Sequence, residues 1–273
     1  MRIEQREHGI DVYVRQSWIS DALMCNERGR NNILRPEWSM PNDATILGTA
    51  VHAGIASVLL GEGNAREVAH EELQRLLSEP FQRVKYTDHE LFNYANDLCD
   101  EWEKSIAPTL GKVTGVEEEF HFEFDKFEIN GTPVTVYGKG TIDCVTETDI
   151  WDWKTSARKY SARDKQSQAV QPTMYSAAMV AKGTHEYPVT FKYGVLVRGG
   201  KGQIVPVHRN ESHTDWLREQ VRPLVRTALL IGTDESWTKN DTHYLCSQTW
   251  CSYWSVCKGS KLSPADIIPK EES

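Results

Sequence analysis

Two short acidic segments constrain the fold of this chain more than any other feature of its sequence. Residues 149–154 alternate aromatic or β-branched side chains with polar ones, which is typical of a β-strand. Successive side chains of a strand point to opposite faces, so Asp152 and Lys154 should point the same way. Residues 134–145 read as the preceding strand, and a polar turn joins the two. We therefore expect a β-hairpin that sets Asp143 beside Asp152.

Two carboxylates and a lysine gathered in this way are suited to metal-dependent hydrolysis of phosphodiester bonds. Divalent metals held by carboxylates stabilise the charge on the phosphorus and on the leaving oxygen, and they lower the pKa of the attacking water. Mg²⁺ and Mn²⁺ take oxygen ligands and keep several waters, so two or three carboxylates suffice. Because the pKa of a lysine moves readily in a confined site, we expect Lys154 to activate or position the water.

Further residues, in the same order along the chain, carry a resemblance to a known family. The sequence resembles the RecB-like branch of the PD-(D/E)XK nuclease superfamily over roughly residues 17–257, and the CRISPR-associated exonucleases belong to that branch. The matching motifs are Asp143, Asp152-Trp153-Lys154, the Gln-x-x-x-Tyr run from Gln171 to Tyr175, and the Gly-x-x-x-His run from Gly48 to His52. The resemblance implies that the aspartates and the lysine are catalytic. It also implies that Gln171 and Tyr175 place the DNA backbone or support Lys154.

A set of metal ligands is implied as well. It consists of His52, Asp143, Asp152 and the backbone carbonyl of Trp153. An imidazole ligand favours Mn²⁺ over Mg²⁺. The alternative for His52 is a core histidine, because it borders the apolar face of a predicted helix. That helix is expected to start with Asp43 as its N-cap. Glu118 shares a strand face with apolar residues and needs a partner there, which makes it either a further ligand or an edge-strand glutamate.

Six cysteines form the second distinctive feature, and without a visible secretory signal a disulfide scaffold is not expected. In the exonucleases that the chain resembles, one early and three late cysteines hold a [4Fe–4S] cluster. The matching residues here are Cys25, Cys246, Cys251 and Cys257. The first late spacing is longer than is common in that family, so a tetrahedral Zn²⁺ site or unliganded thiols remain alternatives. Cys99 and Cys144 are expected in the core.

A basic cluster follows the predicted catalytic lysine, where the substrate backbone should pass. Its members are Arg158, Lys159, Arg163 and Lys165. The net charge of −8 argues mildly against a nucleic-acid partner, but the local field at a binding groove matters more than the total. If these side chains contact phosphates, binding should weaken steeply with salt. The alternative is a solvated loop and helix face.

The remaining pattern predicts an α/β fold of the restriction-endonuclease type, with a mixed central sheet flanked by helices. Helices are expected over 43–60, 64–78, 88–105, 161–182 and 212–231, and strands over 113–125, 133–145, 149–154, 189–198 and 202–208. Pro172 should kink its helix or make it restart near Gln168. Residues 1–262 should form one nuclease domain with its core at about 110–210. A helical N-terminal part and a C-terminal cysteine-rich extension should flank this core, and a loose tail should follow over 263–273.

Together these features predict a Mg²⁺- or Mn²⁺-dependent DNA exonuclease that acts on single-stranded ends in recombination, repair or DNA processing, in a phage or a CRISPR system. An endonuclease of the same fold and a non-catalytic adaptor that binds DNA ends are the alternatives. The composition is that of a soluble globule, and we find no targeting segment and no apolar window of membrane-spanning length. We therefore expect a cytoplasmic protein, of unspecified oligomeric state, with DNA and a recombination or CRISPR-adaptation protein as partners.

Overall fold

A mixed β-sheet of seven strands lies at the centre of the computed structural model, which describes residues 1–167, 170–248, 250–259 and 261. The strands are β1 (Arg2–Arg6), β2 (Gly9–Val14), β3 (Val113–Ile129), β4 (Thr132–Thr146), β5 (Asp149–Ser156), β6 (Val189–Val197) and β7 (Gln203–Arg209). Their spatial order is β1-β2-β4-β5-β6-β7, with β3 paired to β4. The pairs β2–β4 and β5–β6 are parallel and the others antiparallel.

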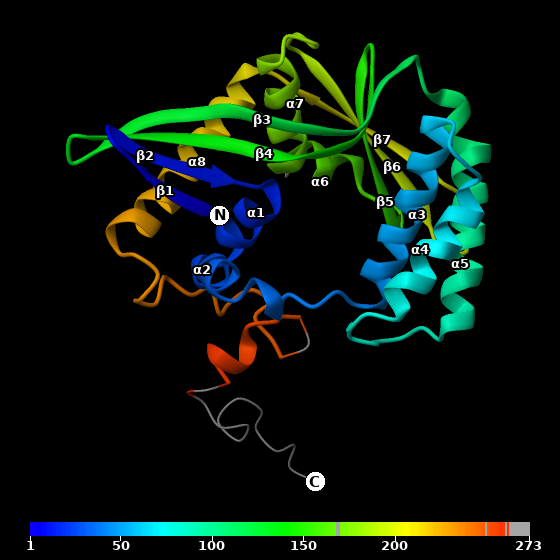
Figure 1. The fold of residues 1–273 in the computed structure, drawn as a ribbon, viewed down its shortest axis with the longest axis horizontal. Helices are drawn as coiled ribbons and strands as arrows, with labels where there is room; N and C mark the ends of the chain where they lie inside the picture. Colours follow the sequence, from blue (N-terminus) through cyan, green and yellow to red (C-terminus); the bar gives the residue numbers. More distant parts are fainter. Residues whose placement is uncertain (168–169, 249, 260, 262–273) are drawn as a thin grey trace.

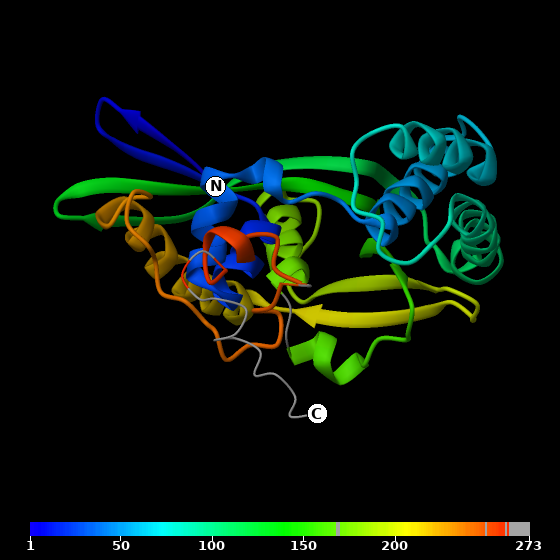
Figure 2. The ribbon, with the colours of Figure 1, turned by 90° about the horizontal axis from the view of Figure 1, so that it is seen from below.

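Helices cover the sheet on both sides. They are α1 (Gln16–Met24), α2 (Asn26–Leu34), α3 (Asp43–Leu60), α4 (Ala65–Leu77), α5 (Asp88–Glu101), α6 (Ala162–Ser167), α7 (Val170–Ala181) and α8 (Glu211–Leu230), with short turns η1 (Pro36–Trp38), η2 (Trp102–Ile106, π-helical), η3 (Ala107–Thr109) and η4 (Trp254–Val256). In Figures 1 and 2, α1, α7 and α8 lie on one side of the long β3–β4 hairpin, and α3, α4 and α5 gather at its far end beside β5. The predicted α/β fold, with a mixed sheet flanked by helices, is confirmed.

The helices bury two hydrophobic cores against the sheet, and the alternation of strand side chains divides residues between them. Where β4 meets β5, Val145 and Ile150 belong to the first core, under α1, α7 and α8. Cys144 and Trp151 belong to the second core, with α3, α4 and α5. Cys144 is fully buried there together with Cys99 of α5, so both thiols lie in the core as predicted.

α3 begins differently from the prediction. Asn42, rather than Asp43, is its N-cap, and the Asn42 side chain accepts a hydrogen bond from the N–H of Thr45 at 3.0 Å. Asp43 is buried instead, and its Oδ2 accepts hydrogen bonds from the backbone N–H groups of three consecutive residues: Val84 (3.3 Å), Lys85 (2.6 Å) and Tyr86 (2.8 Å). The start of α3 is thereby tied to the loop that precedes α5.

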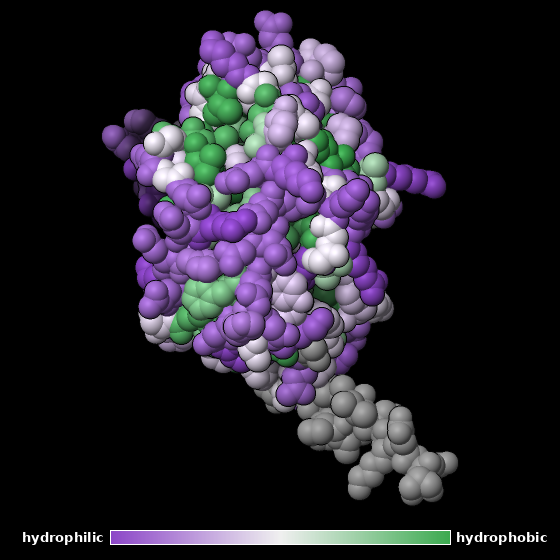
Figure 3. Space-filling view, turned by 90° about the vertical axis from the view of Figure 1, so that its right-hand side faces the viewer, coloured by the Kyte–Doolittle hydropathy of each residue, from purple (hydrophilic) through white to green (hydrophobic). Residues whose placement is uncertain are grey.

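Contrary to the expectation from sequence, α3 is long and apolar enough to cross a membrane by length and composition, and it is the one such helix among the described residues. Half of that helix is buried inside the protein, where Leu47, Val51 and Ile55 pack in the second core. On the side of the molecule that carries α3, α4 and α5, Figure 3 shows mainly hydrophilic residues with separate apolar patches. α3 therefore has the position of a core helix.

The first hairpin of the chain was not among the predicted elements. β1 and β2 form a hairpin ahead of the helical N-terminal part, and β1 is mostly polar, which gives it a weak sequence signal. Within the predicted helix over 161–182, α6 covers Ala162–Ser167 and α7 covers Val170–Ala181, both helical as expected. The predicted restart near Gln168 lies outside the described residues, as does the predicted loose tail over 263–273.

Candidate functional site

β4 and β5 separate where the sequence predicts a pair of aspartates. The antiparallel ladder between them ends at the pair formed by Cys144 and Trp151. Just beyond it, the Asp143 carboxylate accepts a hydrogen bond from the backbone N–H of Trp153, with 2.6 Å between Oδ2 and N. This bond fastens Asp143 to the strand that carries Asp152, so the hairpin brings the two aspartates close together.

Asp152 is held from two sides. The Lys154 ammonium, on the same face of β5, lies 2.5 Å from Asp152 Oδ2. Gln171 of α7 donates a hydrogen bond from Nε2 to Asp152 Oδ1 at 2.6 Å, and the same nitrogen lies 3.3 Å from the hydroxyl of Tyr175 one turn further on. Asp152 is only 2% exposed, so these contacts fix its side chain. The Gln-x-x-x-Tyr segment thus contacts the aspartate directly, whereas the sequence interpretation offered Lys154 or the DNA backbone as its partner.

His52 reaches the same place from α3. Gly48, one turn earlier, faces β5, where an added Cβ would meet Thr155 Oγ1 at 3.1 Å. The glycine therefore lets the helix lie close to the strand. His52 Nδ1 is 3.4 Å from Asp143 Oδ2, so the histidine faces the carboxylates rather than the core alone.

The charges at this place compensate one another. Burial raises the pKa of Asp152 to about 6, although the neighbouring Lys154 acts against this. Burial also opposes the charge on Asp143, but His52 and Lys154 hold its pKa below the usual value. The pKa values of His52 and Lys154 are raised in spite of their burial, because both side chains face the aspartates. A histidine and a lysine therefore balance two carboxylates in this conformation.

A third carboxylate belongs to Glu117, which sequence reasoning missed. Glu118 pairs with Ile142 of β4, so Glu117 lies opposite Asp143. The φ angle of Glu117 is 48°, a left-handed backbone that is uncommon for a residue with a side chain. Burial raises the pKa of Glu117 and the charge of Asp143 raises it further, while His52 acts in the opposite direction. Glu117 is therefore in electrostatic contact with the aspartates.

Glu118, the glutamate proposed from sequence, forms an ion pair with Lys182 instead. The reason is a β-bulge in β3. The ladder runs from the turn at Asn130 and Gly131 with Ile129 opposite Thr132, and it shifts by one residue between Glu123 and Asp125. An unshifted ladder would set Glu118 opposite Asp143, and the bulge brings Glu117 there. The Asn-Gly turn was readable in the sequence, but the bulge was not.

We call His52, Glu117, Asp143, Asp152 and Lys154 the carboxylate site. Three carboxylates and an imidazole are a donor set suited to Mg²⁺ or Mn²⁺, so the residue types fit such an ion. Within the described part of the chain, however, no three His, Cys, Asp or Glu side chains are gathered closely enough to hold a metal ion. The Trp153 side chain is buried in the second core, and its carbonyl stays a predicted ligand.

Of the four basic residues predicted to bind DNA, Lys165 interacts electrostatically with Lys154 and Asp152 of the carboxylate site. Its Nζ is 4.3 Å from the ring centre of Tyr160, and burial, followed by the charge of Lys154, lowers its pKa. The other three are exposed, Arg158 and Lys159 before α6 and Arg163 on it. The structure therefore brings one of the four to the site, and a solvated surface remains the alternative for the rest.

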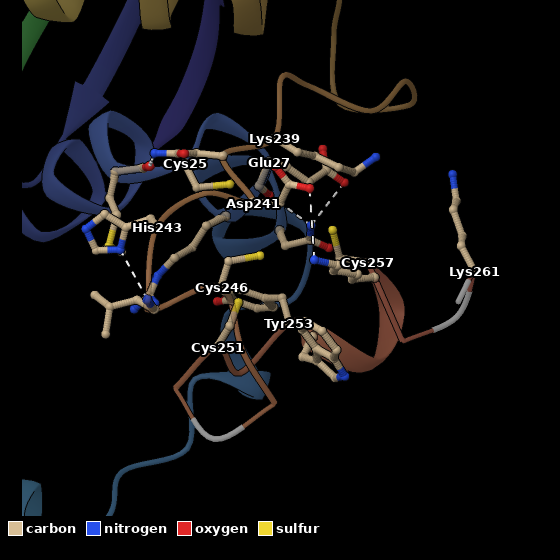
Figure 4. A pocket seen from close by; sticks show the side chains of 17 residues that line it. Cys25, Glu27, Lys239, Asp241, His243, Cys246, Cys251, Tyr253, Cys257 and Lys261 are labelled. Atoms are coloured by element: carbon tan, nitrogen blue, oxygen red, sulfur yellow. Dashed lines mark hydrogen bonds and ion pairs between the residues drawn. The ribbon is translucent and has the colours of Figure 1, made fainter. Parts of the chain in front are cut away.

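The predicted cluster ligands meet at the other end of the molecule. We call Cys25, Cys246, Cys251 and Cys257 the cysteine pocket, because all four line one cavity of about 280 Å³. Figure 4 shows their thiols turned toward a common space. Cys25 lies between α1 and α2, and the other three lie on the irregular C-terminal segment. Burial raises the pKa of Cys246 and Cys257, and the neighbouring thiols add to the effect.

Hydrogen bonds between protein groups also hold the C-terminal segment against the N-terminal helices. The buried Glu27 side chain accepts a hydrogen bond from the N–H of Trp237 at 2.7 Å, and the Glu27 N–H donates to the carbonyl of Thr238 at 3.1 Å. The Asn240 amide donates to the carbonyl of Met24 at 2.9 Å. The pocket walls are therefore joined by contacts that do not involve the thiols.

Whether the cysteine pocket fits a cluster depends on its donors and its size. Four thiolates are the donor set of a [4Fe–4S] cluster. Four thiolates also form a tetrahedral Zn²⁺ site, so the donor type fits either group. Among the described residues, no three ligand-type side chains are gathered closely enough to hold a metal ion.

The chain is similar to known proteins in sequence and in fold. A family model described as the PD-(D/E)XK nuclease superfamily matches residues 30–258. A candidate exonuclease from Eubacterium rectale has a similar fold, with a TM-score of 0.54 and 12% identity over 95% of this chain and 94% of its own. The protein SSO0001 is 14% identical over 97% of this chain and 90% of its own, with a TM-score of 0.44. None of the curated proteins matches.

Proposed function

This chain belongs to the PD-(D/E)XK nuclease superfamily, and from that membership we propose that it is a Mg²⁺- or Mn²⁺-dependent deoxyribonuclease that degrades single-stranded DNA from its ends. The observation that carries the proposal is the surrounding of Asp152. A carboxylate that is 2% exposed is costly unless it is paired, and here Lys154 and Gln171 hold it next to a second aspartate, Asp143.

The residues that would hold the metal are those of the carboxylate site. Asp143, Asp152 and Glu117 would supply oxygens and His52 a nitrogen, with the Trp153 carbonyl as a further ligand. When bound, the metal stabilises charge on the phosphate and lowers the pKa of the attacking water. Glu117 takes the role that the sequence interpretation gave to Glu118, because the bulge in β3 sets it opposite Asp143.

Lys154 and Gln171 have separate tasks in this proposal. Lys154 forms an ion pair with Asp152, so in this proposal its ammonium donates hydrogen bonds to the scissile phosphate and orients the water. Gln171 holds one Asp152 oxygen, and this leaves the other oxygen to face the ammonium. Tyr175 supports the Gln171 amide from one turn away.

The finer assignment to the RecB-like branch rests on the cysteine pocket. We propose that Cys25, Cys246, Cys251 and Cys257 hold a [4Fe–4S] cluster, which joins the two ends of one nuclease domain over residues 1–262. A DNA-end nuclease of this kind would work in the cytoplasm of a prokaryote or of a phage-infected host, in recombination, repair or CRISPR adaptation. Arg158, Lys159, Arg163 and Lys165 would contact the substrate backbone beside the carboxylate site.

The test uses linear single-stranded DNA labelled at either end and a circular single strand of the same composition. We expect loss of one labelled end with Mn²⁺ or Mg²⁺, no loss with EDTA, and an intact circle. Cleavage of the circle would assign an endonuclease instead. Binding without cleavage under every metal would overturn the enzyme and leave a DNA-end adaptor.

A matched pair of variants tests the third carboxylate. Glu117→Gln and Glu118→Gln change neighbouring residues in the same chemical way, but only Glu117 faces Asp143. We expect Glu117→Gln to weaken metal-dependent cleavage about tenfold or more, and Glu118→Gln, which loses an ion pair with Lys182, to leave it near the wild-type rate. The reverse order would return the role to Glu118.

A further inference from the structure

Three aromatic rings from three strands meet on the face of the sheet that is turned away from α7 and α8. Tyr13 of β2, Tyr137 of β4 and His121 of β3 have ring centres 5.0 to 5.6 Å apart, with ring planes within 30° of one another. Tyr13 belongs to neither hydrophobic core. His121 is exposed, so it presents an aromatic ring to solvent. Bases of single-stranded nucleic acid stack on rings of this kind.

Cationic side chains surround these rings. The Arg2 guanidinium lies 4.5 Å from the ring centre of Tyr13, and Lys139 Nζ lies 5.8 Å from it. A hollow of about 380 Å³ lies beside them, and its lining contains three cations, Arg2, Arg15 and Lys139, against one carboxylate, Glu119. Arg2 forms an ion pair with Glu4, so Arg15 and Lys139 are the cations of the hollow that favour an anion, although the whole chain is acidic.

β4 runs from the hollow, which Lys139 and Thr141 line, to Asp143 of the carboxylate site. Residues 136, 138 and 142 are buried, whereas Tyr137, Lys139, Thr141 and Asp143 alternate with them and are only half-buried. Tyr137, Lys139 and Thr141 therefore share one face of the strand, and Asp143 follows them along it. At about 3.3 Å per residue, the six steps from Tyr137 to Asp143 span about 20 Å.

The edge of β4 is also open along this stretch. β2 pairs with β4 only up to Gly138, and β5 pairs with it only at Cys144 and Val145. In Figure 1 no described helix crosses the near face of the hairpin between β2 and α3. A strand of DNA lying there would meet phosphate-binding cations and an exposed ring before it reached Asp143.

We propose that this face of β3 and β4 is a binding track for the single strand that is cleaved at the carboxylate site. Lys139 and Arg15 contact its phosphates, and His121 stacks on one of its bases. The inference rests on the proposed nuclease function and extends it, because it names the path by which several nucleotides next to the scissile bond are held.

The test is fluorescence anisotropy of a labelled single-stranded oligonucleotide with the full chain in EDTA, measured over a range of salt. We expect Lys139→Ala and Arg15→Ala each to weaken binding and to lower the slope of log K against log salt by about 0.7 per lost phosphate contact. His121→Ala should weaken binding about tenfold and leave the slope unchanged, because stacking releases no counterions. Glu119→Gln should tighten binding, because it removes the one carboxylate of the hollow.

Lys126→Ala is the matched control, since Lys126 is an exposed lysine of the same hairpin that pairs with Glu123 away from the hollow. It should keep the wild-type affinity and slope. Wild-type affinity and slope in both Lys139→Ala and Arg15→Ala would overturn the track.

The proposed function is tested separately with the p-nitrophenyl ester of thymidine 5′-phosphate, which has no strand to bind. Hydrolysis by the wild type and its loss in Asp152→Asn support the nuclease whatever the track variants do. If the wild type hydrolyses neither the ester nor DNA, the proposed nuclease fails, and a salt-dependent track still stands as a binding surface.

Discussion

The carboxylate site and the cysteine pocket are placed by different kinds of structure. The aspartates of the carboxylate site come from β4 and β5, inside the sheet, and each has a protein partner: Asp152 has Lys154 and Gln171, and Asp143 has the Trp153 N–H. The thiols of the cysteine pocket come from the junction of α1 and α2 and from an irregular segment, and they line a cavity of about 280 Å³.

The difference predicts how each place responds to substitution. Charges in the carboxylate site already balance one another, so one substitution there should remove activity and leave the fold intact. The cysteine pocket lies on little regular structure, so a bound cluster would contribute directly to the stability of the region, as metals do in small metal-held domains.

The largest effect is expected from Asp152→Asn. The metal contributes several kcal/mol to the chemical step, so loss of this ligand should lower the cleavage rate by about 10³-fold or more, since each 1.36 kcal/mol is tenfold. The measurement is the initial rate on end-labelled single-stranded DNA in Mn²⁺, with the unfolding midpoint recorded on the same samples. Asp149→Asn is the matched control, because Asp149 lies on the same strand and pairs with Lys192 outside the site. A large loss of stability in Asp152→Asn would break the contrast between the two places.

The next effect belongs to Cys251→Ser. We expect anaerobically purified wild-type protein to contain roughly four irons per chain and to absorb visible light as thiolate-bound clusters do. The variant should lose the iron and unfold at a lower temperature. Cys99→Ala is the matched control, because Cys99 is a buried thiol of the second core, and it should keep its iron. If the wild-type chain contained one zinc and no iron, the proposed cluster would be wrong, and the cysteine pocket would hold a Zn²⁺ ion instead.

A smaller effect is expected from Gln171→Ala. Residues that orient a metal ligand typically change metal affinity or activity by about 10- to 100-fold, and Gln171 donates to an Asp152 oxygen. The rate should fall and more Mn²⁺ should be needed for half-maximal cleavage. Gln166→Ala is the control, because that amide donates to the His208 carbonyl instead. An unchanged Mn²⁺ dependence would mean that the amide does not position Asp152.

The two places also differed in how far the sequence predicted them. The Asp-x-Lys alternation placed Lys154 beside Asp152, because it is a local periodicity that the fold preserves. The helical periodicity left His52 open as a core residue, and only the family resemblance implied its place beside Asp143. Glu117 was missed because its position depends on a one-residue bulge that no side-chain pattern announces. Residue order could group the four cysteines, but the contacts of Glu27 and Asn240 that join the two chain ends arise only in three dimensions.

The smallest effect concerns the helix that carries His52. Three backbone N–H groups donate to the buried Asp43 carboxylate. Burial alone would raise its pKa, but these bonds hold the pKa below the usual value. Asp43→Asn should therefore lower the free energy of unfolding at pH 7 by about 1.5–3 kcal/mol, the range for hydrogen bonds to a charged group. The measurement is urea unfolding as a function of pH.

The sign of the pH dependence follows from the depressed pKa. The stabilisation is fully present above the unfolded pKa of about 3.9 and is lost as the pH falls through the lower folded value. The gap between wild type and Asp43→Asn should thus be constant near neutral pH and close in acid. Cleavage at temperatures where both proteins are folded should change little, because the hydrogen bonds of Asp43 are with the backbone of Ala44 and of residues 84–86 and not with the carboxylate site. A cleavage defect as large as that of Gln171→Ala would instead show that the anchoring of α3 sets the geometry of the carboxylate site. The carboxylate site would then depend on distant contacts, as the cysteine pocket does.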